Sequence, residues 1–241
     1  MTALEVLVGR ASVRCALAAV LPHVGGTETT SRVRFTFESG TRLLVSATDG
    51  STLAVARAHV TGVVALPELA VVDVEPRSVR EVLAVFTPPS GKDDRAMWNE
   101  ESFGLTVTED EVSWVERSEI LDGRSLTVPR LPDLGDDRSY PDVPHHLTRF
   151  LQAPLSARPD ATAAPKLLAR FVTSAKAWGD DLQLDLAYRS GPSGFTVQVG
   201  DDFAGVLLPI HRDEERNEFV ARYRDDWITT LTPLARPEET R

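Results

Sequence analysis

The sequence predicts an α+β protein in which a unit of one strand, one helix and several antiparallel strands occurs about three times. Apolar residues at helical spacing alternate with short strand-like runs, and turns rich in Gly, Asp and Ser join successive runs, which favours antiparallel pairing. The same order of elements recurs without detectable sequence identity, so a structural duplication is a hypothesis. The 241 residues, 42% of them hydrophobic, are enough for one large domain or two of ordinary size.

Residues 1–128 predict two such units in one domain. The first unit has predicted strands at 4–8, 32–37, 43–47 and 52–57 and a helix at 10–21; the second has strands at 71–74, 103–107 and 112–116 and a helix at 76–86. Both helices carry apolar residues three and four apart. Pro22 ends the first helix and Pro76 begins the second, where proline is well tolerated.

The remainder of the chain predicts a third unit and a final helix. Residues 129–165 carry seven prolines, so we expect a linker or crossover at 129–164. A partial domain at 165–212 follows, with a helix at 165–177 and strands at 182–186, 195–199 and 205–210. Residues 213–241 predict an amphipathic helix beginning at Asp213 and a tail. This helix is expected to pack back onto its own domain; the alternative is that it binds a partner or self-associates, or covers a neighbouring peptide-binding pocket.

Composition excludes several classes of protein. The net charge of −10 argues against a surface that is basic throughout, although a local basic surface remains compatible with it. Cys15 is the single cysteine, so no intrachain disulfide can form, and a reducing cytoplasm is expected. The sequence begins without a signal-like segment, and no apolar stretch is long enough to cross a bilayer. We therefore expect a cytoplasmic protein that neither is secreted nor spans a membrane.

Four isolated motifs suggest chemistry but have simpler interpretations. Asp49-Gly50 is typical of a hairpin turn rather than of a metal or catalytic carboxylate. Ser90-Gly91-Lys92 lacks the first glycine of a phosphate loop. His145-His146 has no second ligand cluster at recognisable spacing, and Cys15 fits ordinary helix packing better than nucleophilic catalysis. No nucleophile, base and orienting group can be assembled, so the sequence predicts no enzyme, no metal and no cofactor.

One hairpin carries a family resemblance. Ala47-Thr-Asp-Gly50 followed by Leu53-Ala-Val55 resembles the ATDG…LAV hairpin of the bacterial sliding clamp, the beta subunit of the replicative DNA polymerase. Val64-Ala-Leu-Pro67 precedes the second helix, as in that clamp's middle domain. Leu121-Asp-Gly-Arg124 and Tyr140-Pro-Asp142 look like a split version of the DGRFPDY crossover into the family's last domain.

A second match lies near the end of the third unit. Ala204–Arg212 is similar to the family's YVVMPMRL strand, which implies that Leu208, Pro209 and Ile210 help to bind a partner peptide. The family has three domains of two units each, whereas this chain offers about three units and adds a helix beyond residue 212. The resemblance implies a non-enzymatic homo-oligomer that encircles duplex DNA without reading sequence and tethers a polymerase or another clamp-binding protein. The alternative is a clamp-fold interaction module that does not encircle DNA, or a modulator of a true clamp.

Charge on the three predicted helices gives an independent argument. Their seven cations are Arg10, Arg14, Arg77, Arg80, Lys166, Arg170 and Lys176; Glu81 is their single acid, so their net charge is +6 and the rest of the chain carries −16. Successive cations on each helix are mostly three or four residues apart and share a face. Pore-facing helices that contact phosphates inside an acidic body would show this pattern. The alternative is that these are ordinary solvent-exposed helix faces.

Overall fold

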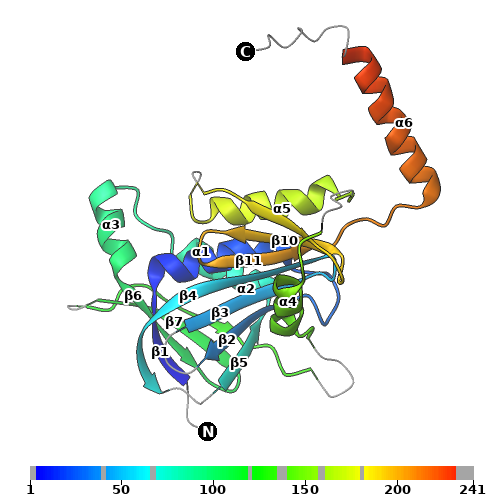
Figure 1. The fold of residues 1–241 in the computed structure, drawn as a ribbon. Coiled ribbons are helices and arrows are strands. Elements are labelled where there is room, and N and C mark those ends of the chain that lie inside the picture. The colour runs from blue at the N-terminus through cyan, green and yellow to red at the C-terminus, as the bar shows by residue number, and fades with distance from the viewer. Residues whose placement is uncertain are drawn as a thin grey trace.

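The computed structural model describes residues 4–38, 42–65, 69–118, 121–134, 140–156, 161–179 and 182–231. It confirms an α+β fold with antiparallel sheets (Figure 1). The first unit contains β1 (Leu4–Gly9), α1 (Arg10–Val20), the 3-10 turn η1 (Leu21–His23), β2 (Val33–Glu38), β3 (Arg42–Thr48) and β4 (Thr52–Ala65). The second contains β5 (Leu69–Val74), α2 (Pro76–Val85), α3 (Lys92–Glu100), β6 (Ser102–Val107), β7 (Glu111–Arg117) and β8 (Ser125–Pro129). The remainder contains α4 (Val143–Gln152), α5 (Pro165–Lys176), β9 (Asp185–Arg189), β10 (Gly194–Val199), β11 (Phe203–Leu207) and α6 (Glu214–Leu231).

The strands of the first two units form a nearly closed, barrel-like sheet. Their order is β5-β2-β3-β4-β1-β6-β7-β8, and an antiparallel bridge between Val74 and Arg130 brings its two ends together. The third unit joins this sheet through one edge of β4. The first part of this edge pairs with β11, where Leu53 lies opposite Val206. The later part pairs with β1, where Val63 lies opposite Val6. The long strand β4 therefore belongs to both parts of the molecule.

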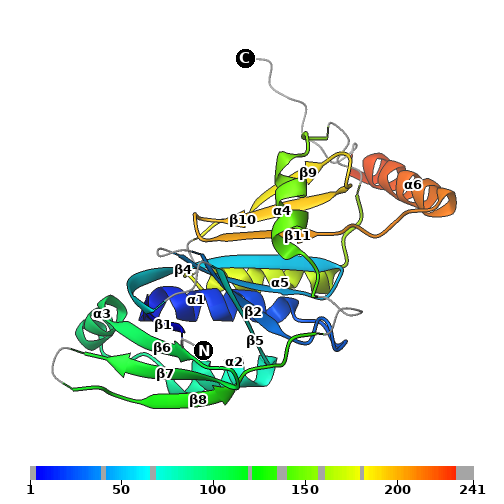
Figure 2. The same ribbon diagram turned by 90° about the horizontal axis from the view of Figure 1, so that it is seen from below.

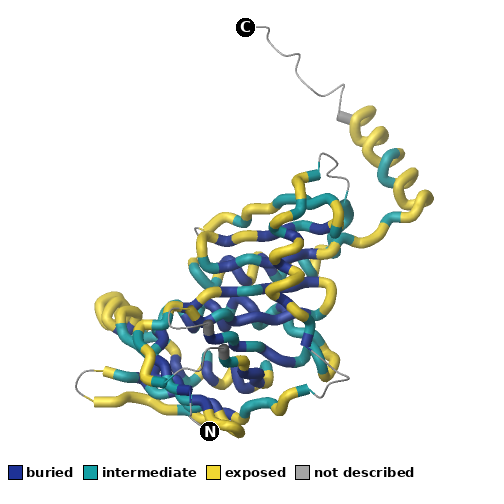
Figure 3. The backbone as a smooth tube through the Cα atoms, turned by 60° about the horizontal axis from the view of Figure 1, so that its bottom comes forward, coloured by how far each residue is buried: buried dark blue, intermediate teal, exposed yellow. Residues whose placement is uncertain are grey.

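Helices cover both faces of the sheet around β4 and β11. α1 and α5 lie side by side on one face, and α4 lies on the other (Figure 2). The alternation of side chains along β4 explains both layers: Ala54 belongs to the main hydrophobic core with residues of α1 and α5, whereas Leu53 packs with residues of α4. Burial follows these layers, with buried residues inside the body and exposed residues along α6 (Figure 3).

Within residues 129–164, expected to form a linker or crossover, the structure has a helix that was not predicted, α4. The Asp142 carboxylate accepts a hydrogen bond from the backbone N–H of His145 at 3.0 Å and caps the helix. Three residues of the helix are buried, Val143, Leu147 and Phe150, and they form the side of α4 that faces the core. The prolines that suggested a linker lie mostly outside the helix or in its first turn, where proline is tolerated.

Four other features differ from the predicted elements. α3 was not predicted, because Trp98 is its single buried residue and no apolar stripe marks it. β8 was also missed, and the ninth strand begins at Asp185 instead of Leu182, since its register follows pairing with β10. α6 begins where Asp213 predicts but does not pack back onto its own domain.

Candidate nucleic-acid interface and partner pocket

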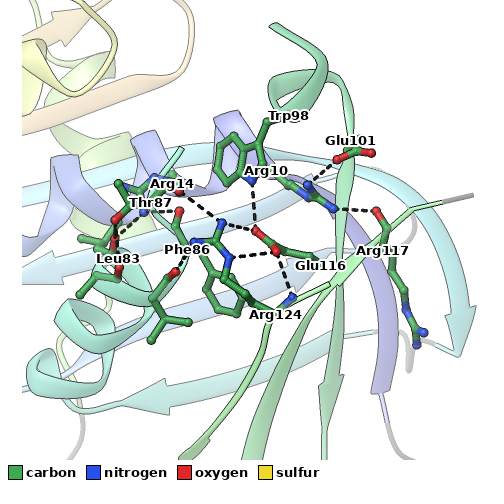
Figure 4. Close-up of polar contacts among 12 residues, drawn as sticks. Arg10, Arg14, Leu83, Phe86, Thr87, Trp98, Glu101, Glu116, Arg117 and Arg124 are labelled. Carbon is green, nitrogen blue, oxygen red and sulfur yellow. Dashed lines mark hydrogen bonds and ion pairs between the residues drawn. The ribbon is translucent and has the colours of Figure 1, made fainter. Parts of the chain in front are cut away.

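The first predicted phosphate contact, Arg10, faces the interior of the protein. Its side chain is 4% exposed, forms an ion pair with Glu101, and donates hydrogen bonds to the backbone oxygens of Ser102 at 3.1 Å and Arg117 at 2.7 Å (Figure 4). The guanidinium also lies 5.7 Å from the centre of the Trp98 ring. Arg10 therefore fastens α1 to β6, β7 and α3, and it is not available to DNA in this structure.

Arg14 also has an internal role. Its Nη1 donates to the backbone oxygens of Leu83 at 2.6 Å and Phe86 at 2.8 Å, at the C-terminal end of α2 (Figure 4). Arg124 donates to the neighbouring Val85 oxygen at 2.6 Å. Two arginines thus satisfy the carbonyl groups left unpaired where α2 ends, and their positive charges suit the negative end of the helix dipole.

A buried carboxylate, Glu116 on β7, holds α3 and the segment after β7 together. It accepts hydrogen bonds from Trp98 Nε1 at 3.1 Å and from Arg124 Nη2 at 2.6 Å. Burial alone raises the pKa of Glu116, but these hydrogen bonds and the charge of Arg124 outweigh it and lower the pKa to about 2. Sequence patterns did not predict this cluster; its one visible sign is Arg124 in the DGR motif.

The hairpin that carried the resemblance is a turn, as predicted, and it also binds α5. Gly50 has a φ of 85°, a conformation that favours glycine, and the Asp49 carboxylate accepts hydrogen bonds from the backbone N–H groups of Ser51 and Thr52. Arg170 of α5 forms an ion pair with Asp49. Burial alone raises the pKa of Asp49, but the Thr52 N–H and Arg170 bonds lower it overall. Arg170 therefore joins the third unit to the first.

A buried histidine completes this junction. His23 Nε2 lies 3.0 Å from Ser174 Oγ, and the Ser174 hydroxyl lies 2.6 Å from the Ala19 carbonyl oxygen. Because that hydroxyl has one proton to donate to a carbonyl, it accepts a hydrogen bond from His23. Burial, with a smaller contribution from the Arg170 charge, lowers the pKa of His23 to about 3, so the imidazole is neutral.

The other four predicted phosphate contacts are exposed. Arg77, Arg80, Lys166 and Lys176 lie on the outer sides of α2 and α5. Arg77 is paired with Glu81 one turn away, at 3.1 Å, but this pair is open to solvent. α1, which lies between the other helices and also contacts α3, has no exposed residue. The seven cations thus divide into three that hold helices in place and four that face solvent.

The predicted partner-binding residues lie beside the hairpin. Leu208 donates its backbone N–H to the Ser51 oxygen at 2.9 Å, and Ile210 pairs with Thr162. The Leu208 and Ile210 side chains are exposed and, with Pro209, line a shallow hollow of about 490 Å³. The fold therefore brings together the two segments that carried the sequence resemblance, although they lie more than 150 residues apart.

The remaining candidates have ordinary structural settings. His145 and His146 are exposed on α4, and burial raises the pKa of the partly covered Cys15 thiol. Within the described ranges, no group of three or more His, Cys, Asp or Glu residues is arranged to hold a metal ion. No helix in that part of the chain combines the length and the apolar character that crossing a bilayer requires.

Comparison with solved structures identifies the fold. The sliding clamp of Bacillus subtilis matches with a TM-score of 0.57 and 14% identity, over 87% of this chain and 64% of that one. A putative DNA polymerase III beta subunit of Eubacterium rectale gives 0.61 and 8%, over 86% and 66%. Proliferating cellular nuclear antigen of Entamoeba histolytica gives 0.57 and 11%, over 88% and 100%.

The comparisons also set the extent of the likeness. No family model matches the sequence, and no curated protein matches it. The chain spans about two-thirds of the length of the bacterial clamps, at 8–14% identity, so the likeness concerns the fold. The folded chain, with its barrel-like sheet, its row of helices and its hairpin against the Leu208–Ile210 segment, has the DNA sliding-clamp fold.

Proposed function

We propose that this protein is a non-enzymatic, sliding-clamp-like tether, several copies of which encircle duplex DNA in the cytoplasm and hold a polymerase or another DNA-processing protein. The clamp fold over 86–88% of the chain is the observation that carries this proposal. A ring of this kind needs phosphate contacts without base readout, and solvent-exposed cations on helices supply such contacts.

We propose four of the seven predicted cations as phosphate contacts, because their exposure supports that role. Arg77, Arg80, Lys166 and Lys176 are exposed and belong to helices on either side of α1. Arg10, Arg14 and Arg170 support binding indirectly, because they fix α1, α2 and α5 in place. The Leu208–Ile210 segment is the proposed docking site for a segment of the partner protein.

Retention on circular DNA tests encirclement. The native chain should remain on nicked circular duplex and slide off once the circle is cut, because a ring has no other route of release. Replacing Arg80, Lys166 and Lys176 by Gln should weaken DNA binding equally for unrelated sequences and lower the slope of log K against log salt by about 0.9 for each phosphate that is no longer neutralised. A matched control replaces the exposed Arg149 of α4, on the other face of the sheet, by Gln. Equal retention of native and triple-variant chains would refute the assignment.

A second candidate function is a clamp-fold interaction module that does not encircle DNA. The observation favouring it is the use of Arg10 and Arg14 inside the protein, together with the packing of α3 against α1. Light scattering at several protein concentrations separates the two functions. A closed ring requires a fixed number of copies, such as a trimer or tetramer, whereas a chain that is monomeric at every concentration favours the module.

A further inference from the structure

Helix α6 presents an apolar row that the rest of the chain leaves uncovered. Phe219, Tyr223 and Trp227 are 44%, 56% and 49% exposed, and their spacing of four residues places them along one side of the helix. Neighbouring ring centres are 6.2 and 6.3 Å apart. α6 projects from the body (Figures 1 and 3), and its rings belong to neither hydrophobic cluster of the described residues. We call these three residues the arm row.

The base of α6 is held, and the arm row is centred on a different side of the helix from the residues that line a hollow with the body. The segment before it is fixed by the pairing of Ile210 with Thr162, and Asp213 caps the helix by accepting a hydrogen bond from the Arg216 N–H at 2.8 Å. Val220 and Ala221 are the partly covered residues of the helix and line a hollow beside the β9–β10 turn. Together with Asn217 and Arg224 they form a side of α6 whose centre lies roughly 110° around the helix from Tyr223, at about 100° per residue. The arm row is therefore left exposed by the described part of its own chain.

A groove of matching character lies on the outer face of the sheet, along α4. We call it the α4 groove; it has a volume of about 510 Å³. Its apolar wall is formed by Leu44, Val55, Leu147, Leu151 and Ala204, and Asp201 and Asp202 line it beside Phe203. The groove adjoins the start of β11, whereas the chain leaves toward α6 from the end of that strand.

The charges beside the arm row are opposite in sign to the net charge of the α4 groove. The guanidinium groups of Arg216 and Arg222 lie 5.1 and 5.8 Å from the centre of the Phe219 ring, so the arm row begins beside two cations. The α4 groove carries two acids, Asp201 and Asp202, and one cation, Arg57, so its charged lining is acidic by one. An amphipathic helix lying in an apolar groove is a recurring mode of protein recognition, and opposite charges set its orientation.

We propose that the arm row of one copy docks into the α4 groove of a second copy of this chain. Arm and groove adjoin opposite ends of β11, so the contact is head-to-tail, and such contacts build rings when the rotation between copies closes. This goes beyond the proposed tethering of DNA, because it assigns the added helix the role of joining copies. It needs no DNA, so it can fail while DNA binding succeeds, and the reverse also holds.

Two full-length variants test the contact by complementation. The arm variant carries Phe219→Ser, Tyr223→Ser and Trp227→Ser. The groove variant carries Thr148→Arg and Asp201→Arg, at two exposed positions lining the groove, where the fold tolerates substitution. Each variant alone should need a protein concentration about tenfold higher, or more, to assemble than the native chain does. An equimolar mixture should form a one-to-one dimer and stop there, since a single intact arm and a single intact groove can meet.

Light scattering at several protein concentrations measures assembly of these variants and of two matched controls. Glu218→Ser with Asp225→Ser alters the opposite side of α6, and His146→Arg alters an exposed position of α4 outside the groove; both should assemble like the native chain. Self-assembly of the groove variant at native concentrations would overturn the proposal, because arms would then pair with one another. A native chain that is monomeric at every concentration, or a mixture of variants that does not dimerise, would overturn it as well.

Discussion

Replacing His23 by Gln should remove an acid sensitivity that the native fold carries. The folded pKa of about 3 lies below the unfolded value of 6.5, so the unfolded chain binds a proton that the folded chain does not. Stability from this group is fully present above pH 6.5 and is lost as the pH falls toward 3. Between pH 8 and pH 5 the native chain should lose about 2 kcal/mol through this residue, at 1.36 kcal/mol for each pKa unit. The carboxylates with lowered pKa values act at lower pH, because Asp and Glu titrate near 4 when unfolded.

Urea denaturation followed by tryptophan fluorescence at pH 8 and pH 5 measures this effect. The quantity of interest is the change with pH of the free energy of unfolding, compared between the native chain and the variant. Any loss of packing in the variant is common to both pH values and cancels. Exposed His145→Gln is the matched control and should follow the native curve. Parallel native and His23→Gln curves would refute the assignment of a buried neutral imidazole.

Two further predictions concern packing and charge. Gly205→Ala would place a methyl group 2.6 Å from a ring carbon of Phe171, so chemical denaturation should show a loss of about 1–3 kcal/mol, whereas Gly26→Ala, with nothing within 4 Å, should show little change. Arg124→Ala removes the main partner of Glu116 and should cost about 2 kcal/mol near pH 7, less than a fully buried pair because the arginine is partly exposed. That cost should shrink as the pH falls from 4.5 toward 2, where the Glu116 carboxylate becomes protonated in the native fold, and a constant cost across this range would contradict the assignment.

Local patterns predicted most helices and strands, and a clear physical signal marks those that were found. The helices at 76–85 and 165–176 have an apolar stripe and a proline in the first turn, and both were predicted to within a residue or two. α3 has no such stripe, since it packs through one tryptophan. α4 does have an apolar stripe, but the many prolines around it favoured the prediction of a linker or crossover. The spacing of apolar residues reveals the buried side of a helix only when several residues of that helix are buried.

The candidate site was harder to predict, because the sequence shows where a charged residue stands but not which residue it pairs with in the folded protein. Arg10 and Arg80 look alike in the sequence, yet Arg10 meets Glu101 from a position 91 residues away, whereas Arg80 faces solvent. Only the fold places those partners together. The Asp49-Gly50 turn was predictable because its geometry depends on neighbouring residues, but its ion pair with Arg170 depends on the packing of α5 against the first unit.

The continuous strand β4 couples the first and third units of the molecule, because it is hydrogen-bonded to strands of both. One backbone segment supplies hydrogen bonds to β3 and β11 along its first half and to β1 along its second. The third unit cannot separate from the first without breaking the ladder between residues 52–56 of β4 and β11, so amides on both sides of the connection around residue 140 should exchange with solvent in one cooperative opening. Cutting the chain in that connection would leave the two pieces paired, because the covalent link is not what holds the third unit in place.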